Sequence, residues 1–140
     1  MAQAISEVQS FNWFLANFVR ATDGVTDTVA VSSDGLLMAM SDGLDRKGAE
    51  RLAAIVSGMT SLARSASRQY GFDGLKLVMV EMRRGFLLVS AISDGSCLGV
   101  VATSHCDLGL VGHEIALLCE RFGGLLTPQI VAQLKNEVLR

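Results

Sequence analysis

Proline is almost absent from this chain, aromatic residues are scarce, and charged residues are few for a small domain. The 140 residues include one proline, 6% aromatic and 19% charged residues, whereas 50% are hydrophobic. A chain of this length folds as one domain that is large enough to bury a core. Because so small a domain needs many polar residues on its surface, we expect the surplus apolar residues to lie at a subunit interface.

Several classes of protein are disfavoured by what the sequence does not contain. It has no run of about 18 apolar residues, as a membrane-spanning helix requires, and its first residues, Met1 to Ala4, do not resemble a signal peptide. A net charge of −2 provides no basic footprint for nucleic acid. We therefore expect a cytoplasmic protein that binds no nucleic acid, does not insert into membranes, and reaches a membrane only through partners.

Motifs of enzymes and cofactor sites are missing as well. The sequence contains neither the GxxxxGK[ST] phosphate loop nor the GxSxG nucleophile turn. The two glycines at positions 109 and 112 lie in a helical pattern and do not have the spacing of a dinucleotide-binding loop. We expect a protein that catalyses no reaction and holds no cofactor.

Cysteine and histidine are the remaining candidates for chemistry. Cys97, Cys106 and Cys119 form no CxxC pair, and their odd number favours reduced thiols. His105 and Cys106 are adjacent, so their side chains diverge, and His113 lies six residues from Cys119, which is not a spacing that places two ligands on one helical face. We expect no metal site, because zinc ligands usually occur as close pairs.

Glu81 is the most unusual carboxylate, because it lies within an apolar strand pattern. One interpretation is a buried acid with a shifted pKa. The interpretation that we favour is an exposed residue near the end of the strand, facing solvent or paired with Arg83 or Arg84, since burying an unpaired acid is costly.

Hydrophobic periodicity and turn residues predict four helices and five strands. Asp-Gly turns separate several of the strands, and Thr127 with Pro128 suits the start of the last helix. The strand order implies a mainly antiparallel sheet, and consecutive apolar residues in the third and fourth strands indicate helices on both faces. The helices are predicted at residues 5–22, 45–70, 107–122 and 127–140, and the strands at 28–32, 36–40, 75–82, 86–93 and 97–103.

The long helix at residues 45–70 carries two stripes. The first is a continuous apolar face, formed by Leu52, Ile55, Val56, Met59, Leu62, Ala63 and Ala66. The second consists of small residues, namely Ala54, Ser57, Gly58, Ser61 and Ser65. Small side chains allow two helices to approach closely, and a glycine inside a helix costs about 1 kcal/mol unless it is compensated. We therefore predict that the second stripe is an interface, with a small solvated face as the alternative.

The order and spacing of these elements resemble the roadblock/dynein light-chain domain family. Three segments carry the resemblance: VAVSSDGLLMAMSDGLDR, AERLAAIVSGMTSLARSA, and RRGFLLVSAISDGSCLGVVATSHCDLGLVGHEIALL. The likeness spans about residues 8–123 and is greatest to bacterial single-domain members encoded beside a small Ras-like GTPase in conservon operons. We place the domain at residues 1–125 and a C-terminal helical tail at residues 126–140.

The resemblance implies an α/β fold of the roadblock and longin type, in the order α-β-β-α-β-β-β-α. It also implies a homodimer in which the third strands pair edge to edge and the long helices lie side by side. Leu77 and Met79 of the third strand then join the small-residue stripe in the dimer interface. The partner implied is a small Ras-like GTPase, within a complex that can include a membrane-bound sensor kinase. Candidate residues for docking the GTPase lie on the long helix: Arg46, Lys47, Glu50, Arg51, Arg64 and Arg68.

Three functions remain open at this point. The one that we favour is a non-catalytic adaptor that binds and regulates the GTPase. The second is a GTPase-activating protein, since one bacterial member of the family has that activity. The third is a structural dimer with unrelated partners, because a fold does not by itself determine a function.

Overall fold

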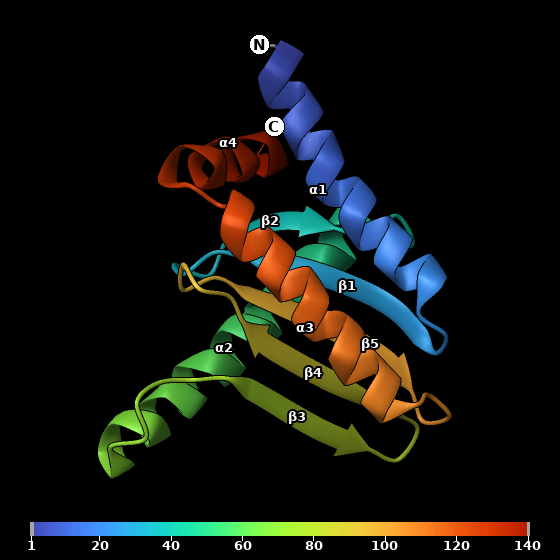
Figure 1. Ribbon diagram of the computed structural model, residues 1–140, viewed down its shortest axis with the longest axis vertical. Helices are drawn as coiled ribbons and strands as arrows, with labels where there is room; N and C mark the ends of the chain where they lie inside the picture. Colours follow the sequence, from blue (N-terminus) through green and yellow to red (C-terminus); the bar gives the residue numbers. More distant parts are fainter. Residues whose placement is uncertain (1, 140) are drawn as a thin grey trace.

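The fold was analysed in a computed structural model, which describes the backbone of residues 2–139 and the side chains of residues 9–138. It has the predicted order of helices and strands and confirms the α/β roadblock and longin-like fold class (Figure 1). The elements are α1 (Ala2–Ala21), β1 (Val25–Val31), β2 (Leu37–Met40), α2 (Arg46–Tyr70), β3 (Leu77–Met82), β4 (Gly85–Ala91), β5 (Cys97–Thr103), α3 (Leu108–Leu125) and α4 (Pro128–Leu139).

All five strands form one antiparallel sheet in the order β2-β1-β5-β4-β3. Hairpins join β1 to β2, β3 to β4, and β4 to β5, whereas β1 pairs with β5 across the chain. The first and third strands in sequence are thereby separated by two others, and β3 becomes an edge of the sheet. Helix α2 lies on one face, and α1 and α3 lie on the other (Figure 1).

The helix ends follow local sequence signals. The carboxylate of Asp45 accepts a hydrogen bond from the backbone N–H of Gly48 at 2.8 Å, which caps α2. At the other end of α2, Gly71 adopts a φ of 66°, a left-handed conformation that glycine takes without strain. Asp107 caps α3 in the same way. Thr127 caps α4, which confirms the predicted start of the last helix.

Two apolar clusters hold the layers together. On the α1 and α3 side, Phe11 and Phe122 meet edge to face with ring centroids 4.8 Å apart, among buried residues such as Leu15 and Ile115. On the α2 side, Val56 packs against Val29 and Val89 of the sheet. A Cβ on Gly99 of β5 would come within 2.5 Å of Val56 Cγ2, so this glycine lets α2 approach the sheet closely.

The third predicted helix was expected to end at residue 122, before Gly123 and Gly124, and the structure corrects this boundary. The helix continues to Leu125, and the N–H of Leu126 still donates to the carbonyl oxygen of Phe122 at 2.9 Å. A Cβ on Gly123 would come within 2.7 Å of Ser93 Oγ. This glycine therefore allows close packing against the turn between β4 and β5 and does not end the helix.

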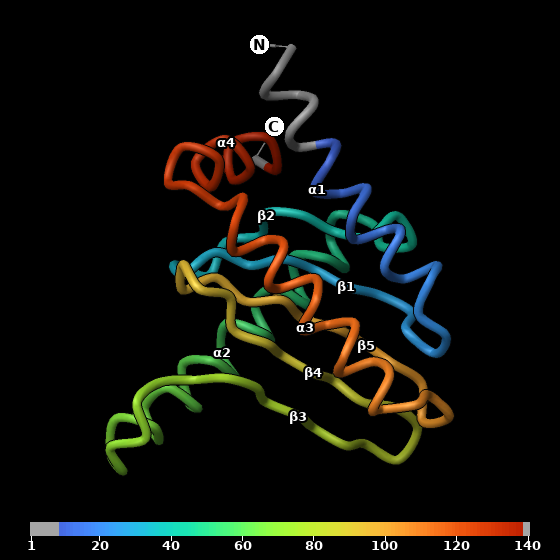
Figure 2. Tube along the Cα trace, in the orientation of Figure 1, coloured from blue at the N-terminus to red at the C-terminus, as the bar shows by residue number. Residues whose placement is uncertain are grey.

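Helix α4 packs on the domain through its own buried residues. Leu134 is fully buried in the cluster that also contains residues of α1 and β2. Lys135 Nζ lies 3.2 Å from Asp34 Oδ2, which fastens α4 to the turn between β1 and β2. Figure 2 shows how the chain passes from α3 into α4 beside α1 and β2. The division of the chain at residues 125 and 126 stays a prediction.

Within the described residues, no single helix combines the length and hydrophobicity that a membrane span needs. Helices α3 and α4 reach that criterion only as a pair, and their axes differ by 106° at the break between them.

Candidate protein-interaction surface

Strand β3 is the uncovered edge of the sheet. It pairs only with β4, so one side of its backbone has no neighbouring strand. The opposite edge, β2, has four residues, most of them buried, and α4 packs beside it. Strand β3 has six residues, and five of them are exposed. A long apolar edge of this kind is a template for pairing with another strand.

Both faces of β3 carry exposed apolar side chains. Leu77 and Met79 are about half exposed on the side of the sheet that bears α1 and α3. Val80 and Met82 point toward the α2 side, like Val78, which packs at the margin of the α2 cluster. The prediction that β3 is covered on both faces is therefore wrong for the single chain. Consecutive apolar residues indicate that both faces of a strand are buried in the functional state. They do not indicate whether the residues that bury it belong to the same chain or to another one.

Helix α2 likewise exposes part of its predicted apolar face. Val56 is fully buried, but Ile55 is 51% exposed and Leu62 is 75% exposed. Other residues complete the buried side of the helix: Ala49, Ala53, Thr60 and Ser67. A helix on a sheet buries only one stripe, so the wider apolar arc of α2 leaves bulky side chains free. Ile55, Leu62, Val80 and Met82 are therefore exposed apolar residues beside the predicted interface that the sequence analysis did not include in it.

The small-residue stripe lies on the outer half of α2. Ala54, Gly58, Ser61 and Ser65 are exposed, whereas Ser57 is half-buried against the β1–β2 turn, where a Cβ on Gly35 would come within 2.7 Å of its Oγ. A Cβ on Gly58 would meet no atom within 4 Å. Nothing in the described part of the chain therefore requires a glycine at position 58, and the position is open for the predicted interface.

The basic residues of α2 divide into two groups. Arg64 points back to the sheet, where its Nη2 donates to the carbonyl oxygen of Gly95 at 3.0 Å and approaches Cys97 Sγ at 3.5 Å. Arg46 pairs with Glu50 at 3.1 Å along the helix surface. Lys47, Arg51 and Arg68 are exposed, and Arg68 donates to Ser65 Oγ. Arg64 thus has a structural role, and the other candidates remain available to a partner.

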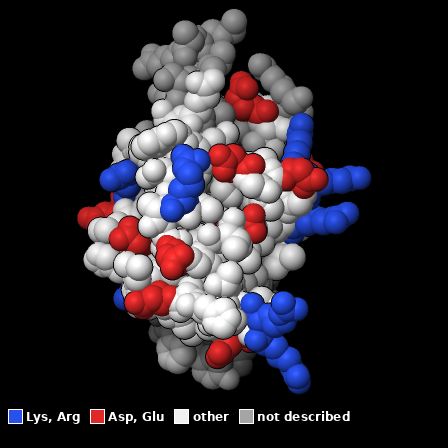
Figure 3. Space-filling model, turned by 90° about the vertical axis from the view of Figure 1, so that its right-hand side faces the viewer, with Lys and Arg blue, Asp and Glu red and all other residues white. Residues whose placement is uncertain are grey.

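Helix α2 is basic although the whole chain is acidic. It holds five Lys and Arg residues and one acidic residue, whereas the chain has 12 basic and 14 acidic residues. In Figure 3, positive side chains gather along the right-hand edge, which corresponds to the back of Figure 1, where α2 lies. The face that carries the small-residue stripe therefore attracts negatively charged surfaces.

The residues considered for chemistry do not converge. Among the described residues, no three His, Cys, Asp or Glu side chains are placed to share a metal ion. All three cysteines are free thiols, and burial raises the pKa of Cys97 and Cys119. Glu81 is exposed on β3, in agreement with its predicted contact with solvent.

Comparison with known proteins identifies the family. The roadblock/LC7 domain model matches residues 11–102. The crystal structure of a roadblock/LC7 domain from Streptomyces avermitilis is 33% identical in sequence. It superposes with a TM-score of 0.77 over 81% of this chain and 95% of that chain. This chain belongs to the roadblock/LC7 family.

More distant structures share the fold. MglB from Myxococcus xanthus is 15% identical, with a TM-score of 0.76 over 83% of this chain and 94% of that chain. An MglB structure described as having a tetrameric arrangement is also 15% identical, with a TM-score of 0.74 over 94% and 92% of the two chains. No curated protein is significantly similar in sequence.

Proposed function

We propose that this chain is a non-catalytic adaptor, which forms a homodimer and binds a small Ras-like GTPase. The observation that carries the proposal is the bare apolar edge at β3, flanked by exposed Ile55 and Leu62 of α2. Soluble domains rarely leave such an edge uncovered. The family resemblance supplies the nature of the partner, and a sensor kinase at a membrane would belong to the same complex.

In the proposed dimer, two β3 strands pair across a twofold axis and extend the sheet. The α2 helices then run side by side, because each lies on the same face of the joined sheet. Ala54, Gly58, Ser61 and Ser65 allow their close approach, while Leu62 and Met82 are withdrawn from water. The same patch serves both subunits, as an isologous contact requires.

The GTPase docks on the outer surface of the α2 pair. Lys47, Arg51 and Arg68 give this surface positive charge. Arginine binds carboxylates through two parallel hydrogen bonds, which suits an acidic partner. Such charges act mainly on association rate and specificity.

The dimer is tested by measuring molar mass with light scattering at micromolar concentrations. We expect the wild-type mass to exceed that of one chain, 14.9 kDa. Met79→Lys and Leu62→Asp place charges at the interface and reduce the mass, whereas Leu36→Asp, at another exposed leucine, does not. A wild-type monomer, or an assembly that is indifferent to both interface variants, would contradict the proposed dimer.

GTPase binding is tested with a Ras-like GTPase encoded beside this protein, immobilised in its GDP form or with a non-hydrolysable GTP analogue. We expect saturable binding that differs between the two nucleotide states. A single-turnover GTP hydrolysis assay then separates adaptor from activator: an unchanged rate supports the adaptor, and acceleration supports the alternative function. Absence of binding in both states would leave only the structural dimer.

A further inference from the structure

Helix α3 carries a second exposed stripe, on the face of the sheet opposite α2. Three of its leucines are nearly half exposed: Leu110 at 43%, Leu117 at 48% and Leu125 at 45%. They are spaced by seven and eight residues, about two helical turns each, so they lie along one side of the helix. Glu114 and Arg121 occupy the same side between them. We call these five residues the α3 stripe.

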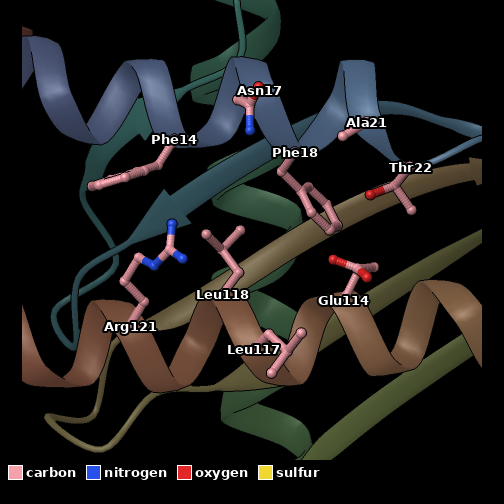
Figure 4. Close-up of a pocket in the computed structure, with 9 residues that line it drawn as sticks. All are labelled: Phe14, Asn17, Phe18, Ala21, Thr22, Glu114, Leu117, Leu118 and Arg121. Atoms are coloured by element: carbon pink, nitrogen blue, oxygen red, sulfur yellow. The ribbon is translucent and has the colours of Figure 1, made fainter.

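Neither charge of the α3 stripe has an ion-pair partner within 4.0 Å among the described residues. Within the described part of the chain, neither Glu114 nor Arg121 takes part in an ion pair or a hydrogen bond. The Arg121 guanidinium lies 5.3 Å from the ring centroid of Phe14, across the space between α1 and α3. Figure 4 shows Arg121 and Glu114 extending from α3 toward α1, two turns apart, with Leu117 between them.

The order of side chains along the α3 stripe is complementary to itself. Reversing the helix about the midpoint between Leu117 and Leu118 exchanges Glu114 with Arg121 and Leu110 with Leu125. Two copies of α3 that pack antiparallel about a twofold axis therefore place Glu114 opposite Arg121 twice and Leu110 opposite Leu125 twice, with the two copies of Leu117 next to the axis. An isologous contact requires this kind of reciprocity.

We propose that the α3 stripe is a docking surface for a second copy of this chain, with the two α3 helices antiparallel. Between α1 and α3 lies a cavity of about 180 Å³, lined by Phe14, Phe18 and Leu118 among others. This hollow gives room for a leucine from the facing helix. The contact withdraws three leucines from each copy and pairs both charges, which a parallel arrangement of the helices would not do.

The α3 contact is distinct from the β3 and α2 surface, because α2 lies on the opposite face of the sheet and β3 is its edge. Glu114 and Arg121 of the α3 stripe extend instead toward α1. Both can be occupied at once, and dimers formed through β3 would then associate further through α3. The resulting assembly contains four chains, or more if the two twofold axes do not close. The α3 contact forms whether or not β3 pairs.

Charge reversal tests the proposal in the full chain. Glu114→Arg places arginine opposite arginine twice, and Arg121→Glu places glutamate opposite glutamate twice. We expect each single variant to weaken the α3 association at least tenfold, as judged by sedimentation equilibrium over a range of concentrations. The double variant restores opposite pairs in exchanged positions, so its association should return to within about threefold of wild type.

Thermal unfolding of each variant serves as the control for folding. Glu114→Arg is the more informative single change, because Arg121→Glu also removes the contact with Phe14. Failure of the folded double variant to recover association would overturn the antiparallel pairing. If Glu114→Arg associates as strongly as wild type, the antiparallel pairing is also overturned. The α3 stripe would then be a binding surface for a different protein.

A Met79→Lys background separates this proposal from the β3 dimer. If both contacts exist, Met79→Lys leaves a dimer that Glu114→Arg converts to monomer. If only the β3 contact exists, Met79→Lys alone gives monomer and the α3 proposal fails. If only the α3 contact exists, Met79→Lys changes nothing while Glu114→Arg abolishes the dimer, which contradicts the proposed function and supports the α3 contact.

Discussion

Arg64 donates a hydrogen bond from Nη2 to the carbonyl oxygen of Gly95, 3.0 Å away, and so links the C-terminal half of α2 to the β4–β5 turn. The same guanidinium nitrogen lies 3.5 Å from Cys97 Sγ at the start of β5. The sequence places Arg64 on the same helix as Arg51 and Arg68, with nothing to distinguish it. These contacts show that the guanidinium of Arg64 points toward the β4–β5 turn and not toward solvent on the outer side of α2.

Arg64→Ala is therefore expected to destabilise the fold. Loss of a part-buried hydrogen bond from a charged donor should lower the free energy of unfolding by about 1 to 2 kcal/mol. Urea unfolding followed by circular dichroism measures the change. Arg51→Ala is the matched control on the outer side of α2 and should change the stability by less than about 0.5 kcal/mol. Equal effects of the two variants would argue against a structural role for Arg64.

Substitution of Gly58 separates folding from association. A Cβ at this position meets open space, so Gly58→Ala should raise the stability of the single chain by up to about 1 kcal/mol through helix propensity. Gly58→Leu has a bulky side chain that overpacks the contact between two α2 helices and should weaken dimerisation. Light scattering on dilution compares the two variants. A dimer that tolerates leucine equally well would move the interface away from this stripe.

Reversal of charge on the outer face of α2 should slow association with the GTPase. Arg51→Glu combined with Arg68→Glu leaves two exposed positions negatively charged, and we expect folding and dimerisation to be unaffected. The difference from wild type should shrink at high salt, where the Debye length falls to about 3 Å at 1 M. Surface plasmon resonance at two salt concentrations provides the association rates.

A control for this experiment is the same change of charge in the β3–β4 turn, with Arg83→Glu and Arg84→Glu. These residues are exposed and lie off α2. An effect of equal size in both double variants would indicate general electrostatic steering. Wild-type rates in the α2 variant would place the docking site on another surface.

The cysteines should differ in reactivity while the protein is folded. Burial raises the pKa of the Cys97 thiol, and its side chain is only 4% exposed, so less of the reactive thiolate forms and reagents reach it slowly. Alkylation followed by mass spectrometry at pH 7.5 should label Cys97 more slowly than Cys106. In denaturant without reductant, all three thiols should react. Finding two of them joined in a disulfide would contradict the prediction of reduced thiols.

The ion pair between Lys135 and Asp34 should stabilise the attachment of α4 in a pH-dependent way. The hydrogen bond from Ser32 and the contact with Lys135 lower the pKa of Asp34 below its usual value of 3.8. Because the pKa of Asp34 is lower in the folded chain, the stabilisation is fully present above the usual pKa of 3.8. It is lost as the pH falls through the lowered pKa of the folded state. Lys135→Ala should reduce stability by about 0.5 kcal/mol at pH 7, since the pair is partly exposed.

The comparison to make is therefore between melting temperatures of wild type and Lys135→Ala at pH 7 and below pH 3. The difference should narrow at acidic pH. Lys135→Arg keeps the positive charge and should behave like wild type. A difference that is independent of pH would show that Lys135 acts through packing instead.

Local signals predicted much of the fold. Asp45 and Asp107 start helices because a short acidic side chain can accept a hydrogen bond from the first turn. Gly35 forms the turn between β1 and β2 with a φ of 87°, which an Asp-Gly sequence favours. These features depend on neighbouring residues alone, so the sequence reveals them. The same reasoning failed at Gly123, which was expected to follow the end of a helix. Glycine is also required where a helix packs closely against another segment, as Gly123 does against Ser93.

Part of the interaction surface was also predictable. The small residues of α2 stand out in the sequence because Gly58 is unfavourable in a helix without a compensating contact. The apolar residues of β3 were recognised, and the family resemblance implied that β3 is an edge strand, but the apolar pattern alone suggested a strand covered on both faces. Exposure depends on strand order, and β3 becomes an edge only because β1 pairs with β5 across the chain.

The sequence by itself determined the order of helices and strands, the helix caps, the turns and the high apolar content. Only the tertiary structure decided which apolar residues the single chain leaves exposed. Helix α2 rests on the sheet through one stripe, so Val56 is buried and Leu62 is not, although both belong to the same apolar face. The sequence shows the period of the apolar residues along a helix or strand. Which of these residues are buried depends on the elements that pack against each side in the folded chain.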